Sequence, residues 1–386
     1  MSKLKKGISL ALLAAIPIAY HQLYNKTFGN KASSNKMKTL PNINLPNNDF
    51  YISEDNYDSD MTETVLPYIA EREEILSFET THRINYVRYQ CDDPVANLVI
   101  SHGYAEDFER YAEAVYYFLN MGYNVYLPEH FGHGNSHVGV DDPTVIWVND
   151  FDTYTFDLYR FIKDVVEENE PHLPVIAYGH SMGGGILARS LELYPDLCTA
   201  AILTSPMLQV YLKGPESFIL PLTHALSKTS ISKLPVPGDT GFKKELPNDF
   251  NPEKAATHSY ARGSFFHHRK WVEDKKSRFA VSFGWVNESL KATHEIVKKE
   301  HVEQIEVPML MFQAETDSFV DPKGQFEFAE HAKDLEFYQV PGSYHEIYSE
   351  TDDIIVPYFN KIDQFIKDVL RRNEIKAQES RIPQGF

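Results

Sequence analysis

The chain has 386 residues, of which 42% are hydrophobic and 24% charged, so it can bury a large core and is no small disulfide-stapled scaffold. Its 55 acidic and 37 basic side chains give a formal net charge of −18, which repels a phosphate backbone and disfavours binding to nucleic acid. Its two cysteines, Cys91 and Cys198, lack zinc-site spacing, and we expect two separate thiols, with one disulfide between them as the alternative.

Residues 1–26 differ in composition from the rest of the chain. Three lysines, at positions 3, 5 and 6, precede the uncharged run 7–20, which is typical of a signal peptide or an N-terminal membrane anchor. The run is shorter than the ~20 residues of a comfortable membrane span, although Leu23 and Tyr24 could extend it to residues 7–24. Because Pro17 and Tyr20 interrupt the small residues around Ala19, we favour an uncleaved anchor over a cleaved and secreted product. We therefore expect a membrane-associated protein, exported or anchored by this segment; a buried helix of a cytosolic protein is the alternative.

Residues 27–68 are rich in Asn, Ser, Asp and Pro and show no hydrophobic periodicity. This composition predicts a flexible spacer between the N-terminal segment and the body of the chain.

From residue 69 to 386, short β-rich runs alternate with helical patterns. The runs that predict strands are Glu74–Phe78, Ile84–Tyr89, Ala96–Ser101, Asn124–Leu127, Val175–Tyr178, Ala200–Leu203, Met309–Gln313 and Glu336–Val340. Helical spacing of apolar residues occurs at Phe108–Met121, Phe151–Glu167, Met182–Leu193, Gly324–His331 and Ile354–Arg371. The alternation predicts an α/β domain with a mostly parallel, eight-stranded sheet covered by helices on both faces.

The alternation stops between about residues 207 and 300. Proline-rich loops and aromatic clusters occur there, with helices expected near Trp271–Phe279 and Trp285–Lys299. We interpret this region as a cap inserted into the α/β domain.

The strongest chemical signal is Gly179-His180-Ser181-Met182-Gly183. This G-x-S-x-G motif follows a predicted strand and precedes a predicted helix, which is the setting that presents a serine nucleophile on a sharp turn. The flanking glycines avoid collisions in that turn. We therefore predict that Ser181 is the nucleophile and that the backbone N–H of Met182, at the helix N-terminus, stabilises an oxyanion.

A serine nucleophile needs a histidine base and an acid, which follow it along the chain in this kind of fold. Asp317 lies just after a predicted strand, and His345 follows the last one. We predict Asp317 and His345 as the acid and base, although Glu315 and Asp321 are rival acids and His345 is one of 16 histidines.

The second oxyanion donor is expected in the loop after the third strand, and we assign it to the backbone N–H of Tyr104. His102, in the same loop, is expected to hold the loop by hydrogen bonds rather than to act as a second base. The histidine-rich segment 130–137 lacks acidic or cysteine ligands at fixed spacing, so we expect a loop there. We expect neither a metal nor another cofactor.

These motifs together resemble a known family. The sequences His102-Gly103, Phe131-Gly132-His133-Gly134-Asn135-Ser136, Gly179 to Gly183, Asp317 and Gly342-Ser343-Tyr344-His345 are similar to those of α/β-hydrolases of the monoacylglycerol lipase and bacterial lysophospholipase group. The resemblance spans about Glu74 to Leu370. Two cap segments, Thr257-His258-Ser259-Tyr260-Ala261-Arg262 and Gly284-Trp285-Val286-Asn287-Glu288-Ser289, look more like the lysophospholipase branch. Glu129-His130 departs from the Asp-Arg pair that the family usually shows.

The resemblance implies hydrolysis of the acyl ester of a single-chain phospholipid through a Ser-His-Asp triad. A monoacylglycerol lipase or carboxylesterase is the alternative; a peptidase, an epoxide hydrolase or a catalytically silent binding protein is less favoured. The implied partners are a lipid substrate and a membrane surface. Members of the lysophospholipase branch associate with the inner membrane, and export or anchoring by residues 1–26 would place a bacterial chain on the periplasmic side of that membrane.

Overall fold

The structure is a computed structural model, and it describes residues 36–41, 49–211, 216–236, 250–251, 255–270 and 279–381. The predicted N-terminal segment 1–26 lies outside the described residues. So does residue range 271–278, where a cap helix was expected.

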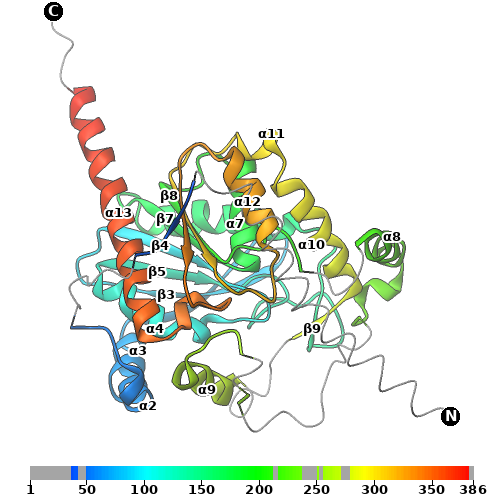
Figure 1. The fold of residues 1–386 in the computed structure, drawn as a ribbon, viewed down its shortest axis with the longest axis horizontal. Coiled ribbons are helices and arrows are strands. Elements are labelled where there is room, and N and C mark those ends of the chain that lie inside the picture. The colour runs from blue at the N-terminus through cyan, green and yellow to red at the C-terminus, as the bar shows by residue number, and fades with distance from the viewer. Residues whose placement is uncertain are drawn as a thin grey trace, which may run out of the picture.

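The described residues form a main sheet of nine strands in the order β1-β11-β10-β8-β7-β4-β5-β3-β2 (Figure 1). The strands are β1 Met37–Thr39, β2 Glu73–Glu79, β3 Arg83–Tyr89, β4 Ala96–Ser101, β5 Tyr123–Pro128, β7 Val175–His180, β8 Ala200–Thr204, β10 Met309–Ala314 and β11 Leu335–Val340. The β2–β3 and β3–β5 pairs are antiparallel, and all other neighbours in this sheet are parallel. The predicted α/β class is therefore confirmed, with one strand, β1, beyond the eight expected.

The sheet separates two hydrophobic cores. Along β4, Leu98 packs in one core and Val99 in the other, because successive side chains of a strand point to opposite faces. The helices α4 Ala112–Asn120 and α13 Asp352–Arg381 cover the first face. The second is covered by α5 Asp152–Phe161, α7 Met182–Leu193 and α12 Pro322–His331. Figure 1 shows α13 and α4 on the opposite side of the sheet from α7 and α12.

The prediction of a flexible spacer over 27–68 is wrong for the part of it that the structure describes. Residues 37–39 form β1, which pairs with β11. The helical elements η1 Glu54–Asn56, α2 Tyr57–Asp60, η2 Met61–Val65 and α3 Leu66–Ala70 follow. Their buried residues, Tyr57, Met61, Val65 and Ile69, recur every four positions and face the first core. The sequence analysis did not predict these helices, because polar residues dominate the composition around their single apolar stripe.

The region predicted to be a cap, in the part that the structure describes, follows β8 and precedes β10. It contains α8 Glu216–Ser227, η5 Ser230–Lys233, α9 Tyr260–His268, α10 Phe283–Ile296 and α11 Lys299–Val302. Strand β9 Ala280–Val281 pairs with β6 Val145–Ile146 of the body, outside the main sheet. Helix α10 matches the one expected near Trp285–Lys299, whereas α8 and α9 were not predicted. Pro221 lies inside α8, and a proline at such a position indicates a loop in the sequence.

Both cysteines are unpaired, as expected. Burial raises the pKa of the Cys198 thiol to about 12, which keeps it protonated and unreactive.

Candidate active site

Ser181 occupies a sharp turn between β7 and α7. Its backbone has φ +52° and ψ −119°, which is unusual for a residue with a side chain. Two backbone hydrogen bonds hold the turn: Ser181 N donates to Thr204 O at 3.1 Å, and Met207 N donates to Ser181 O at 2.8 Å. The turn is therefore anchored to the neighbouring strand β8 and the residues that follow it.

The glycines of the motif are required by close backbone approach. A Cβ atom at Gly183 would lie 1.9 Å from Ser101 O, and one at Gly179 would lie 2.7 Å from Gly183 O. The turn therefore packs directly against the end of β4, where no larger residue fits.

Ser181, His345 and Asp317 form a hydrogen-bonded line. Ser181 Oγ lies 2.9 Å from His345 Nε2, and His345 Nδ1 lies 2.6 Å from Asp317 Oδ2. Because a carboxylate only accepts, Nδ1–H donates to Asp317, which leaves Nε2 as the acceptor for the Ser181 hydroxyl. The structure thus brings together the three side chains that the sequence predicted, in the geometry of a nucleophile, a base and an acid that orients the base.

Electrostatics reinforce this pairing. Burial alone would lower the pKa of His345, but the charge of Asp317 and their hydrogen bond outweigh it and raise that pKa. Burial would raise the pKa of Asp317, but His345 and two backbone N–H groups outweigh it and lower that pKa. Asp317 therefore stays ionised and favours the protonated form of His345.

Asp317 also orders its own turn, because its Oδ1 accepts hydrogen bonds from Phe319 N at 2.8 Å and Val320 N at 3.0 Å. The rival acids have other partners. Asp321 caps α12 by accepting from Lys323 N, and Glu315 accepts from Gly342 N at 2.7 Å.

The two predicted oxyanion donors lie in segments that meet at this turn. Met182 is the first residue of α7, where backbone N–H groups have no acceptor within the helix. Tyr104 follows β4, and its ring packs against the Trp285 ring of the cap, with centroids 4.5 Å apart. The assignment of these two N–H groups to an oxyanion hole remains a prediction.

His102 holds the loop, as expected. Its Nδ1–H donates to Gly103 O at 2.8 Å, and its Nε2 accepts from His130 N at 3.0 Å. Burial lowers its pKa to about 4, so the ring is neutral and keeps both bonds at neutral pH.

Glu106 is a site residue that sequence reasoning missed. It accepts hydrogen bonds from Gly103 N at 2.6 Å, Tyr111 Oη at 2.6 Å and Tyr348 Oη at 2.9 Å. It also lies 3.7 Å from Nε2 of His180, the residue before the serine. Glu106 therefore ties the loop after β4 to the loop that carries the candidate base. In the sequence, Glu106 lies three residues after Gly103, a spacing that allows a local hydrogen bond to the Gly103 N–H.

The histidine-rich segment 130–137 forms a loop. His130 Nε2 lies 3.0 Å from Ser101 Oγ, and Glu129 accepts from Asn85 Nδ2 and Asn135 N, both at 2.8 Å. Burial raises the pKa of Glu129 to about 7. Among the described residues, no group of three or more His, Cys, Asp or Glu side chains is arranged to hold a metal ion.

The sheet and the Ser181 turn define an α/β-hydrolase. The family described as serine aminopeptidase, S33, matches residues 92–352, and the chain belongs to this family. Lysophospholipase L2 of Escherichia coli strain K12 is 26% identical over 293 residues, which cover 72% of this chain and 84% of that protein. Human monoglyceride lipase is 25% identical over 278 residues, covering 71% and 82%.

The fold also matches solved structures. A soluble variant of monoglyceride lipase from Saccharomyces cerevisiae, in complex with a substrate analog, aligns with a TM-score of 0.61 at 20% identity, covering 77% of this chain and 96% of that one. A carboxyl esterase from Bacillus coagulans aligns with a TM-score of 0.60 at 19% identity, covering 77% and 98%. The expected resemblance to the monoacylglycerol lipase and lysophospholipase group is confirmed, and the chain is an ester hydrolase of the serine class.

Proposed function

We propose that this chain is a lysophospholipase that uses Ser181, His345 and Asp317 as its catalytic triad. The observation that carries the proposal is the hydrogen-bonded line from Ser181 Oγ through His345 to Asp317. The similarity to lysophospholipase L2 over most of both chains supports the substrate class.

In the first half of the reaction, His345 Nε2 takes the Ser181 hydroxyl proton while Oγ attacks the ester carbonyl carbon. The backbone N–H groups of Tyr104 and Met182 stabilise the oxyanion. When the tetrahedral intermediate collapses, the bond to the glycerol oxygen breaks and His345 returns its proton to that oxygen. Water, activated by His345, then attacks the acyl-enzyme and releases the fatty acid. Asp317 stabilises the imidazolium in both halves.

Aromatic side chains beside the triad support an acyl chain as the ligand. The Phe319 ring is half exposed and lies 4.9 Å from the His345 ring. On the oxyanion side, the Tyr104 ring packs against Trp285 of the cap. A half-exposed apolar ring beside the candidate base suits a substrate with a long hydrocarbon chain.

The second candidate is a monoacylglycerol lipase, because human monoglyceride lipase is similar at nearly the same identity and coverage. The two activities differ only in the group attached to the glycerol. The test compares fatty-acid release from lysophosphatidylcholine, lysophosphatidylethanolamine and monoacylglycerol that carry the same acyl chain. Faster turnover of the lysophospholipids supports the proposal, whereas turnover of monoacylglycerol alone overturns it in favour of the second candidate. An aminopeptidase substrate in a fourth arm tests the activity that the family description names.

We also propose that the protein associates with a membrane through residues 7–24. No helix among the described residues is long and apolar enough to span a membrane, and residues 7–24 are not among them. Exposed apolar side chains in and after α8, Leu222 at 57% and Leu234 at 53%, support contact between the cap and a lipid surface. The full chain should float with zwitterionic vesicles at high salt, and substituting Leu12 and Leu13 by Arg should abolish flotation. Equal flotation of both chains would contradict the role of this segment.

A further inference from the structure

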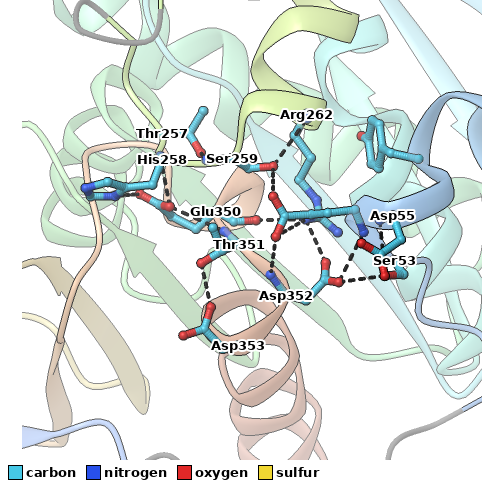
Figure 2. A network of polar contacts seen from close by, with 12 residues as sticks. Ser53, Asp55, Thr257, His258, Ser259, Arg262, Glu350, Thr351, Asp352 and Asp353 are labelled. Carbon is cyan, nitrogen blue, oxygen red and sulfur yellow. Dashed lines mark hydrogen bonds and ion pairs between the residues drawn. The ribbon is translucent and has the colours of Figure 1, made fainter.

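Two segments that are distant in sequence meet beside the candidate base. We call residues 341–351, which connect β11 to α13 and carry His345, the histidine loop. We call residues 256–262 the cap segment; it includes the start of α9 and the whole of the motif 257–262 that the sequence resemblance singled out. Figure 2 shows the two segments joined by a network of polar contacts.

Main-chain atoms of the histidine loop bond directly to the cap segment. Glu346 N, next to the candidate base, donates to Ala256 O at 2.9 Å. At the other end of the loop, Ser349 O accepts from Thr257 Oγ1 at 2.6 Å. The cap segment therefore binds the loop just before its short helical turn, Ile347–Ser349, and at the last residue of that turn.

Glu350 is the centre of this contact. Its side chain is fully buried, and its Oε1 accepts from Tyr344 N at 2.6 Å and lies 3.1 Å from His258 Nδ1. Its Oε2 accepts from His258 N at 3.0 Å and Thr351 N at 3.3 Å. The rings of His258 and Tyr344 also stack, with centroids 3.6 Å apart. One carboxylate thus links the residue before the candidate base to the cap.

Arg262 fixes the cap segment to the body of the enzyme. Its side chain is fully buried, and its Nη1 donates to Glu350 O at 3.0 Å. The same guanidinium pairs with Glu113 of α4, with Nη2 3.0 Å from Oε1, and with Asp352 at the start of α13, 2.9 Å away. Because the acids lie on two different helices, Arg262 holds the cap segment against the body of the protein. Figure 2 shows Arg262 beside Asp352.

The backbone N–H groups of Tyr344 and Glu346, the neighbours of His345, therefore both take part in the contact between the histidine loop and the cap segment. Tyr344 N binds Glu350, and Glu346 N binds Ala256. We propose that Glu350 is a positioning residue, which aligns the His345 imidazole with Ser181 by tying its loop to the cap. This inference rests on the proposed function, because it assigns a role to Glu350 through the base of that reaction.

The physical requirement is placement of the imidazole. A shift of about 1 Å in a catalytic group can cost about a hundredfold in rate. Replacing Glu350 by Ala would leave the N–H groups of Tyr344 and His258 without their buried acceptor, and the loop would move to satisfy them. We expect substrate binding to stay unchanged, because the Glu350 carboxylate is fully buried and its hydrogen bonds go to groups of the protein.

The test measures kcat, KM and the rate of Ser181 labelling by a fluorophosphonate in the full chain. E350A should lower kcat and labelling about ten- to hundredfold, with KM within about twofold of the wild type. E350Q should recover part of the loss, because its amide oxygen still accepts one N–H. The matched control is D368N, a carboxylate-to-amide change at an exposed position of α13, which should leave all three quantities unchanged.

Wild-type kcat and labelling in E350A would overturn the positioning role. If E350A does not fold, H258A answers the same question from the cap side, since it removes the ring stack and the Nδ1 contact. It should lower kcat about three- to tenfold at unchanged KM, and wild-type kcat would again overturn the proposal. A wild-type chain that no fluorophosphonate labels would instead refute the proposed function.

Discussion

Ser181 Oγ and His345 Nε2 lie 2.9 Å apart, although 164 positions separate the two residues in the sequence. Asp317 closes the same line from a third loop. Ser181 follows β7, Asp317 follows β10 and His345 follows β11. These strands are parallel, so the loops after their carboxyl ends lie at one edge of the sheet. The site is therefore a consequence of strand order, and its chemistry depends on how well each loop is held.

The bond between Asp317 and His345 predicts a large effect of Asp317→Asn. The amide N–H₂ group would donate to Nδ1, which places the remaining ring proton on Nε2, where it can no longer accept from Ser181. We expect kcat to fall about a thousand- to ten-thousandfold. Asp321→Asn and Glu315→Gln, changes at the rival acids, should leave kcat within about twofold. A loss at either rival as large as that at Asp317 would contradict the assignment.

The pH dependence follows from the same pair. His345 must be neutral to accept the serine proton, and its pKa is raised by Asp317, Glu346 and Glu106 against the opposing effect of burial. His180, whose ring centroid is 4.9 Å from that of His345, has a pKa lowered to about 3, mainly by burial, and stays neutral. A plot of kcat/KM against pH should therefore rise with a midpoint above the ordinary histidine value of 6.5. A midpoint below 6.5 would show that Asp317 does not stabilise the protonated form of His345.

The close approach at Gly183 predicts that Gly183→Ala is destabilising. Its Cβ would lie 1.9 Å from Ser101 O, so β4 or the serine turn would have to move. We expect a loss of at least about 2 kcal/mol in the free energy of unfolding, with loss of activity. The matched control is Gly122→Ala, where φ is +91° but the nearest atom is 3.9 Å away, so only backbone strain of about 1 kcal/mol applies and activity stays. Urea unfolding measures both, and equal stability of the two variants would contradict the packing argument.

Sequence predictions agree with the structure where the hydrophobic periodicity of an element and a chemical requirement point to the same residues. Ser181, Asp317 and His345 could be located because each follows a recognisable strand in a fixed order. Short helices with one apolar stripe were missed: α2 and α3 lie in a polar stretch, and α8 contains Pro221.

Glu106 and Glu350 were missed for a different reason. Glu106 lies three residues after Gly103, a spacing that suits a local hydrogen bond, but its bond from Tyr348, like the bond from His258 N to Glu350, joins loops that only the tertiary structure brings together. Buried carboxylates of this kind are recognised by their hydrogen-bond donors, which come from distant parts of the chain.

The packing of residues 57–70 against the first hydrophobic core can be tested at Met61. Its side chain is fully buried in the core beside α4, so Met61→Ala should lower the free energy of unfolding by about 2–5 kcal/mol. Thr62→Ala, at an exposed neighbouring position, should change it by no more than about 0.5 kcal/mol. Equal stability of the two variants would mean that residues 57–70 do not belong to the core.

The proposed reaction requires that Ser181 carries the acyl group of the intermediate. It is tested most directly by incubating the chain with lysophosphatidylcholine, quenching in acid during the first turnovers and mapping the acylated peptide by mass spectrometry. We expect one acyl group, on Ser181, and none in Ser181→Ala, while Ser59→Ala, an exposed control, should be acylated like the wild type. Acylation of a different residue, or acylation and fatty-acid release that persist in Ser181→Ala, would contradict it.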